Sequence, residues 1–429
     1  MAPRVGTPSI ATRAAAMLAA TLALAAALAG CAGGGRADVS AHTGLGMNSS
    51  TPSTPASCAA TVLASLARVA MHVYHEGVAS ERTAVAVGTI TKDPALRAAV
   101  EHGDAQATRA AAQALIAAGH MTNLLVSRAG RVLADVGSPY AVAPLRATIK
   151  SAAGAPIASF VTSVWSSEGL LAETNGITEG HTTLRTHAGD VPGSFALPPR
   201  RLPPRGTLTE AGGRFQYTSF GARLFPSGSL RVYLARTLRS TAPECGANEQ
   251  ETVVKTLSRE ARLIYNGEGG RRALPQVRRV QSDPALLRAV ASRDSSATRR
   301  AIDRLLNQHI VRLRVSTGGR LLADVGGPFV LAPVRALLRR GTRTIGSFVL
   351  SIQDDEGYLR LAHRLLGLNV LMYMGAQLVK NSLGPSPTAV PASGSYRYRG
   401  RSFRVFTFDG EAFPSGVLRI AVLIPIPYS

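Results

Sequence analysis

The pattern of apolar and polar positions predicts helices followed by strands, and it does so twice along the chain. Apolar residues recur at three- and four-residue spacing, as in amphipathic helices, in 59–76, 93–116, 251–264 and 297–308. Shorter segments after them alternate as strands do. The predicted strands are 122–126, 131–136, 156–164, 214–220, 230–235, 310–315, 320–325, 344–352, 396–398, 402–408 and 417–424. Helices followed by a hairpin and further antiparallel strands predict an α+β fold.

One stretch of sequence occurs in two copies, GRVLADVGSPYAVAPLR at 130–146 and GRLLADVGGPFVLAPVR at 319–335. Asp135 and Asp324 occupy the same position in the two copies. We expect the first glycine of each copy to form a hairpin turn and the proline of each Ala-Pro pair to begin a short crossing helix. A repeat this far along the chain indicates two like modules in tandem.

The sequence therefore divides into four parts. They are a predicted signal peptide at 1–30, a flexible tether at 31–57, and modules at 58–243 and 244–429. The tether contains mainly glycine, serine, threonine and other small residues, so it cannot bury enough apolar surface to offset the entropy of ordering it.

The N-terminal segment carries the features of an export signal. A basic start with Arg4 and Arg13 precedes an apolar run at 14–28, which is too short for a stable membrane span. The run ends in Leu28-Ala-Gly-Cys31, which resembles a bacterial lipobox. The resemblance implies a lipid on Cys31 and a place on the extracytoplasmic face of the cell membrane. An ordinary signal peptide with an incidental cysteine is the alternative.

The charge of the chain suggests which partners to consider. The formal net charge is +22 at pH 7, and arginine supplies almost all of the positive charge. Outside the cytoplasm, a basic surface meets anionic lipid headgroups or acidic wall polymers, and export argues against nucleic acid as a partner. A basic surface without a particular partner is the alternative.

Two cysteines remain beyond Cys31. Cys58 and Cys245 each stand just before the first helix of a module, so they occupy equivalent places in the two copies. Because an exported protein folds in an oxidising compartment, we expect a disulfide between them. Two separate buried thiols are the alternative.

The modules resemble a known family of sensor domains. A long N-terminal helix, a hairpin whose second strand ends in Leu-Ala-Asp, and a later Gly-Ser-Phe-Val strand are similar to the Cache (PDC) family of extracytoplasmic PAS-like domains, over roughly 58–240 and 245–428. The resemblance implies a sheet that cups a small ligand, such as an amino acid or a carboxylate, and a signal passed on by a transmembrane helix. We see no second apolar stretch long enough for such a helix, so we expect any message to pass through a partner, such as a membrane signalling protein.

Candidate ligand-binding residues cluster after the predicted strand 344–352. They are Gln353, Asp354, Asp355, Tyr358, Arg364 and Tyr373. The aspartates could take a ligand ammonium, the arginine a carboxylate and the tyrosines a hydrogen bond. Alternatively, one of the aspartates caps the helix that begins near Glu356, a role compatible with binding.

The first module lacks this set. Its equivalent segment, 165–170, begins with Trp165 and has neither the aspartates nor the tyrosine. If folding alone required the acidic cluster, both modules should keep it. We therefore expect the second module to bind a ligand and the first to have a degenerate pocket.

Catalysis and metal binding have little support in the sequence. His72 and His75 lie on one face of a predicted helix with Glu76, but no third ligand to a metal is evident. No nucleophile elbow, phosphate-binding loop or paired-carboxylate signature is present. We expect a binding protein with no cofactor or metal, and not an enzyme. The alternative is a structural envelope lipoprotein whose basic surface holds an anionic wall polymer or lipid.

Overall fold

The computed structural model describes residues 54–428, apart from 120, 199–200, 211–212, 271, 307–308, 329, 386 and 414–415. The predicted signal peptide, Cys31 and the tether up to residue 53 lie outside the described residues. The end of the tether was predicted wrongly, because residues 55–57 form the first turn of α2 (Pro55–Ala79). Thr54 caps this helix by accepting a hydrogen bond from Ser57 N at 3.2 Å.

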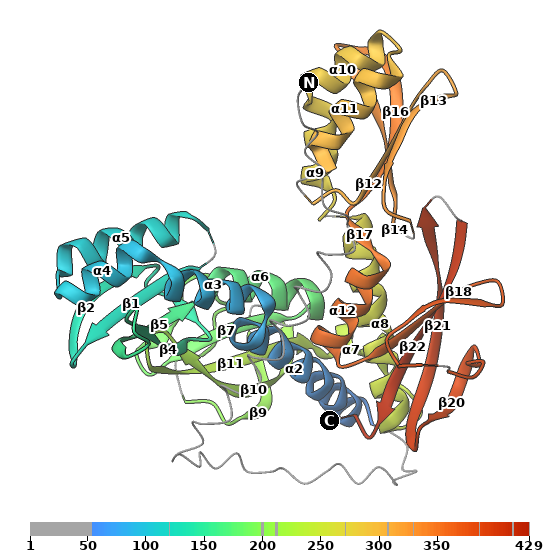
Figure 1. Cartoon of the computed structure of the whole chain (residues 1–429). Helices are drawn as coiled ribbons and strands as arrows, with labels where there is room; N and C mark the ends of the chain where they lie inside the picture. The colour runs from blue at the N-terminus through green and yellow to red at the C-terminus, as the bar shows by residue number, and fades with distance from the viewer. Residues whose placement is uncertain are drawn as a thin grey trace, which may run out of the picture. The chain divides into compact units, whose positions relative to one another are not determined.

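The first module, residues 54–244, begins with helices and continues into strands (Figure 1). Its other helices are α3 (Glu81–Lys92), α4 (Pro94–His102), α5 (Ala105–Ala117), α6 (Ser167–Thr178), α7 (Leu238–Thr241) and the 3-10 helix η1 (Ala242–Glu244). Its strands are β1 (Asn123–Arg128), β2 (Arg131–Gly137), β3 (Ala141–Val142), β4 (Leu145–Lys150), β5 (Pro156–Ser163), β6 (Trp165–Ser166), β7 (His181–Thr186), β8 (Gly189–Asp190), β9 (Arg205–Glu210), β10 (Gly213–Leu224) and β11 (Gly228–Thr237).

The second module, residues 245–428, repeats this order. Its helices are α8 (Glu249–Gly269), α9 (Leu274–Ser282), α10 (Pro284–Ala291), α11 (Ser295–Leu306) and α12 (Asp355–Leu366). Its strands are β12 (Arg312–Thr317), β13 (Arg320–Gly326), β14 (Val330–Leu331), β15 (Val334–Arg340), β16 (Arg343–Ser351), β17 (Gln353–Asp354), β18 (Asn369–Met374), β19 (Gln377–Asn381), β20 (Ser393–Tyr398), β21 (Arg401–Phe413) and β22 (Gly416–Ile426).

Each module contains two antiparallel sheets with the same strand order. In the first module the orders are β2-β1-β5-β4 and β6-β3-β10-β11-β7-β8, with β9 beside β10. In the second they are β13-β12-β16-β15 and β17-β14-β21-β22-β18-β19, with β20 beside β21. The α+β class and the tandem of PAS-like modules are therefore confirmed. The alternating pattern does not reveal that each module has two sheets, since consecutive strands such as β5 and β6 belong to different sheets.

The predicted crossing helices are wrong. After Pro144 and Pro333 the chain forms β4 and β15, which pair with β5 and β16. Ile149 and Leu338 are fully buried in these strands. A proline just before a strand costs no ladder hydrogen bond, so the same residue that can start a helix can also precede a strand.

Helix α2 supplies the core of the first module. The segment 56–92 is long and apolar enough by composition to cross a membrane. However, Val62, Leu66, Val69 and Val73 are 0% exposed, and Ser80 ends the helix by capping the next one. The segment therefore consists of two helices, of which α2 packs in the core of the folded module.

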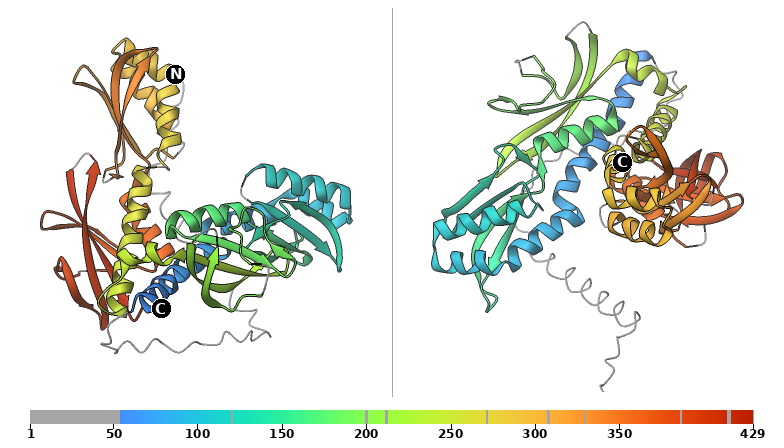
Figure 2. Two further views of the ribbon diagram at one scale, coloured as in Figure 1. Left: turned by 180° about the vertical axis from the view of Figure 1, so that it is seen from behind. Right: turned by 90° about the horizontal axis from the view of Figure 1, so that it is seen from above.

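The two modules share part of their core. The long helices α2 and α8 pack against each other, and α12 packs against both (Figure 2). Val69 and Val73 of α2 lie in one apolar cluster with Leu257 of α8 and Leu365 of α12. The predicted disulfide is present, with the Cα atoms of Cys58 and Cys245 5.6 Å apart.

Charged side chains are buried beside α8. Arg236 and Glu244 form an ion pair at 2.8 Å with both side chains 2% exposed, and Arg259 reaches the same carboxylate at 2.5 Å. Glu260 is 0% exposed, and neither of its carboxylate oxygens has a hydrogen-bond partner. Burial raises the pKa of Glu260 well above its ordinary value, and the charge of Glu244 adds to this, while Arg236 and Arg259 oppose it.

Glu260→Gln is expected to remove a pH dependence of stability. With its pKa raised in the folded state, Glu260 stabilises the fold when protonated, and this contribution is lost as the pH rises from the ordinary range of a glutamate through the raised value. Urea denaturation between pH 5 and 8 measures the free energy of unfolding. The difference between variant and wild type should rise in favour of the variant by about 1–3 kcal/mol towards neutral pH, the usual cost of an unsatisfied buried polar group. The exposed control Glu101→Gln should leave the profile unchanged, and parallel profiles for wild type and Glu260→Gln would contradict the prediction.

Candidate functional site

The first turn of α12 holds the acidic residues predicted from the sequence. Asp354 caps the helix, with its Oδ1 accepting from Gly357 N at 2.7 Å, so the capping role proposed as an alternative is confirmed. Asp355 Oδ1 accepts from Glu356 N at 2.9 Å. Both carboxylates are favoured here because the N-terminal end of a helix is the positive end of its dipole.

Two buried acceptors at this turn have no donor. Gln353 is 5% exposed and Asp355 6%, and neither Gln353 Oε1 nor Asp355 Oδ2 has a hydrogen-bond partner. Lys380 Nζ lies 3.6 Å from Asp355 Oδ2, which is an ionic contact longer than a hydrogen bond. A buried acceptor without a donor costs about 1–3 kcal/mol, so a donor group that reached both atoms would be held strongly.

Lys380 completes the cluster and was not predicted. It lies on β19 opposite Met372, whose side chain belongs to the core beneath α12. A hydrogen bond from Nζ to Glu356 Oε1 at 2.9 Å raises the pKa of Lys380 and lowers that of Glu356. Lys380 is one of only four lysines in an arginine-rich sequence, and this rarity is the only feature of the sequence that could have drawn attention to it as a site residue.

The other three predicted residues lie elsewhere. Tyr358 is fully buried and donates its hydroxyl to Ala261 O at 2.9 Å. Arg364 forms an ion pair with Glu76 of α2. Tyr373 packs on the opposite face of β18, in a separate apolar cluster beneath the guanidinium of Arg419. The structure thus keeps Gln353, Asp354 and Asp355 together at the start of α12, commits the Tyr358 hydroxyl to α8 and the Arg364 guanidinium to α2, and places Tyr373 in another cluster.

The first module fills the equivalent place with an aromatic ring. Its helix α6 is capped by Ser166, as α12 is capped by Asp354, and both caps accept from a glycine amide in the first turn. Trp165, just before the cap, therefore corresponds to Gln353, and Ser167 to Asp355. The indole packs so closely on Gly77 and Gly169 that a Cβ at these positions would lie 2.3 Å and 3.1 Å from its carbons.

A groove lies between α6 and α8. It has a volume of about 700 Å³, and an ion pair between Arg272 and Glu173 (2.5 Å) joins its two sides. Its lining residues are Ala172, Glu173, Asn175, Gly176, Ile177, Glu179, Leu263, Ile264, Asn266, Gly267, Gly270 and Arg272.

Two glycines explain this groove. The hydroxyls of Tyr74 in α2 and Tyr265 in α8 accept equivalent backbone hydrogen bonds, from Arg223 N and Glu411 N, so these two tyrosines align the helices. Gly267 lies two residues after Tyr265, and Glu76 lies two residues after Tyr74, so the two positions are equivalent. When α6 and α12 are aligned on their caps, Gly176 of α6 is equivalent to Arg364 of α12. An ion pair closes the contact between α2 and α12, whereas its counterpart between α6 and α8 remains open.

Metal ligands do not gather in the described part of the chain, where no group of three or more His, Cys, Asp and Glu side chains has the geometry to hold an ion. His72 Nδ1 instead lies 3.3 Å from Leu365 O. Burial lowers the pKa of His72, which disfavours the charged form of its imidazole.

No protein-family model and no curated protein sequence matches the chain. Among solved structures, an extracellular ligand binding receptor from Desulfohalobium retbaense is 10% identical with a TM-score of 0.26, and the match covers 51% of this chain and 47% of that one. The periplasmic domain of Vibrio cholerae LuxQ is 10% identical with a TM-score of 0.21, covering 43% of this chain and 100% of that one.

A selenomethionine form of the LuxQ domain gives 8% identity, a TM-score of 0.22 and coverages of 44% and 100%. The chain matches about half the length of the Desulfohalobium receptor. Likenesses of this size concern the fold alone and assign no ligand to this chain.

Proposed function

We propose that this protein is an extracytoplasmic binding protein of the sensor type, which takes a small polar metabolite at the first turn of α12 in the second module. The observation that carries the proposal is the pair of buried acceptors without donors, Gln353 Oε1 and Asp355 Oδ2. Buried polar atoms are almost always paired in proteins, so two together mark a place where a donor belongs.

The chemistry of the cluster favours an amino acid as the ligand. An ammonium group would donate to Asp355 and Gln353, and its charge would be balanced by the carboxylate of Asp355. Lys380 can reach the carboxylate of the same ligand, since its flexible side chain now bridges Asp355 and Glu356. The first module lacks both acceptors and has the ring of Trp165 in their place, so it would support the fold and leave binding to the second.

The proposed compartment rests on the disulfide between Cys58 and Cys245, a bond that persists in oxidising surroundings. A lipid on Cys31 would hold the protein at the membrane through the segment between Cys31 and α2, and a membrane protein would receive the message. Binding without catalysis, cofactor or metal is part of the proposal.

Calorimetry and thermal shift against a panel of amino acids and organic acids test this site. An amino acid at about 100 times its dissociation constant should stabilise the wild type by about 2.7 kcal/mol. Asp355→Asn keeps the size of the side chain and removes its charge, so it should weaken binding about 10- to 100-fold, the value of one charge-assisted hydrogen bond.

Two further variants make the test specific. Gln353→Trp copies the first module and should abolish binding, whereas Ser167→Ala changes the equivalent position of the first module and should leave the affinity at the wild-type value. Equal affinity in wild type and Asp355→Asn, or no stabilisation by any compound in the panel, would overturn the proposal.

A further inference from the structure

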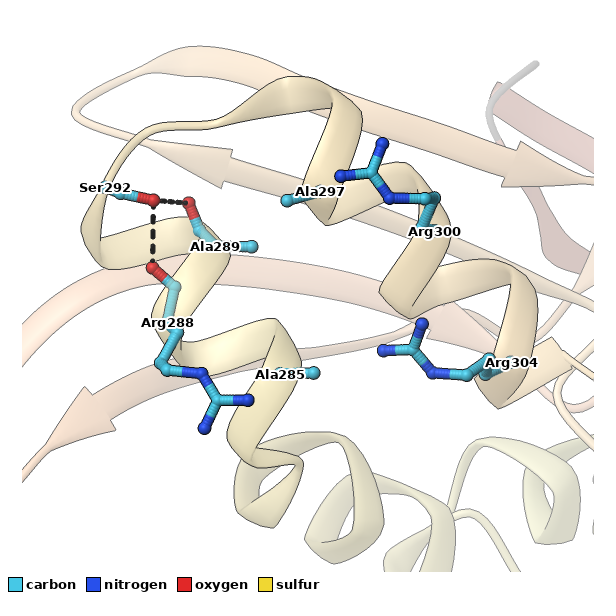
Figure 3. A pocket seen from close by; sticks show the side chains of 7 residues that line it. All are labelled: Ala285, Arg288, Ala289, Ser292, Ala297, Arg300 and Arg304. Atoms are coloured by element: carbon cyan, nitrogen blue, oxygen red, sulfur yellow. Dashed lines mark hydrogen bonds between the residues drawn. The ribbon is translucent and has the colours of Figure 1, made fainter.

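A groove lined by arginines lies on the two helices that cover the four-stranded sheet of the second module (Figure 3). Arg288 extends from α10, and Arg300 and Arg304 extend from α11 towards it. Alanines and one serine form the remaining lining: Ala285, Ala289, Ala297 and Ser292. The groove has a volume of about 400 Å³ and opens to solvent.

These three guanidinium groups have no partner among the described residues. All three side chains are exposed, and none takes part in an ion pair, a hydrogen bond or a ring contact. The acidic residue between the helices, Asp294, is engaged as a cap, with its Oδ1 accepting from Ala297 N at 2.9 Å. Three like charges facing one small groove repel each other, which costs stability unless an anion shares them.

The first module shows that the fold does not require these arginines. Asp93 and Asp283 cap equivalent helices, and each accepts from a leucine amide at 2.6 Å. When the two modules are aligned on these caps, Arg288, Arg300 and Arg304 correspond to Ala98, Ala110 and Ala114. All three positions are therefore alanine in one copy and arginine in the other. A general bias of the sequence towards arginine would not select three positions around one groove.

We infer that this groove binds a ligand that carries several phosphate groups along a chain. A guanidinium group donates two parallel hydrogen bonds to a phosphate, which makes arginine the side chain best suited to it. Arg300 and Arg304 are one helical turn apart, about 5–6 Å along the axis, and can each meet a different phosphate of a chain. One phosphate group, with a charge of about −2, would leave part of the positive charge unbalanced.

The lining favours such a chain over a membrane surface. Helices that dock on bilayers place large apolar side chains beside their cations, and these enter the lipid. Here the cations are accompanied only by alanine and serine, and the surface is hollow. The groove thus fits a narrow polyanion, such as a polyphosphate or a phosphodiester polymer of the cell envelope, better than a flat array of headgroups.

Binding of sodium tripolyphosphate to the purified protein tests this inference, with orthophosphate and vesicles of phosphatidylglycerol and phosphatidylcholine as separate arms. We expect wild type to bind tripolyphosphate at least tenfold more tightly than orthophosphate, and to lose this affinity as salt increases. The triple variant Arg288→Ala, Arg300→Ala, Arg304→Ala should bind it on the order of tenfold more weakly, since exposed ion pairs are individually modest.

Matched variants separate the groove from net charge. Arg82→Ala, Arg109→Ala, Arg131→Ala removes three exposed arginines of the first module and should leave binding unchanged. Conversely, adding Ala98→Arg, Ala110→Arg and Ala114→Arg to the triple variant should restore it, because all three alanines are exposed. Equal losses in both arginine triples would overturn the inference, as would binding to vesicles without binding to tripolyphosphate. Neither result depends on the amino-acid site at α12.

Discussion

Replacing Cys58 and Cys245 with alanine is expected to lower the free energy of unfolding by about 2–5 kcal/mol. The bond closes a loop with a sequence separation of 187 residues, and closing a long loop removes much of the entropy of the unfolded chain. Urea denaturation followed by circular dichroism measures the loss. Wild-type protein treated with dithiothreitol should unfold at the same urea concentration as the double variant.

The single variants Cys58→Ala and Cys245→Ala provide the control. Each should lose the same stability as the double variant, because either one breaks the bond. Wild-type protein whose denaturation midpoint does not respond to the reductant would show that the bond contributes nothing, and would also remove the main support for an oxidising compartment.

Replacing Tyr358 with alanine is expected to cost about 3–5 kcal/mol, the usual result of removing a large buried ring. The side chain is 0% exposed, packs edge-on against Tyr265 with ring centroids 5.9 Å apart, and donates to Ala261 O of α8. Tyr358→Phe keeps the ring and removes only the hydroxyl, so it should cost about 1 kcal/mol. Chemical denaturation of both variants measures these losses.

Ligand affinity separates packing from direct binding at this residue. Because the hydroxyl of Tyr358 is buried and donates to Ala261 O, Tyr358→Phe should bind the ligand of the wild type with unchanged affinity. A variant that keeps full stability but loses the ligand would show that the tyrosine belongs to the site after all.

The hairpins and helix starts could be predicted because single residues determine them. Gly130 and Gly319 have φ angles of +80° and +79°, the left-handed conformation that the turn signal implied. Asp93 and Asp283 cap α4 and α10, and each is followed by a proline, which the first turn of a helix accommodates. By contrast, β18 escaped prediction because four of its six residues are buried, so both faces are apolar and no alternation remains.

The candidate site could be predicted only where neighbours in sequence are also neighbours in space. Gln353, Asp354 and Asp355 follow one another at a strand end and were found together. Tyr358 and Arg364 lie further along α12, where the direction of a side chain depends on what packs against the helix, and here that is α8 for one and α2 for the other. Lys380 comes to the site by strand pairing across a turn, which the sequence does not display.

Helix α12 connects the proposed amino-acid site to the contact between the two modules. It begins at the Asp354 cap beside the proposed amino-acid site and, about 15 Å further on, its last turn carries Arg364 into contact with Glu76 of the first module. A rigid-body shift of this helix at its first turn would therefore move the ion pair as well. The open groove between α6 and α8 has no such contact at the equivalent glycines. That groove is instead bridged by the ion pairs of Arg272 with Glu173 and of Arg259 with Glu179, so the two copies of the duplication join the modules through different charged residues.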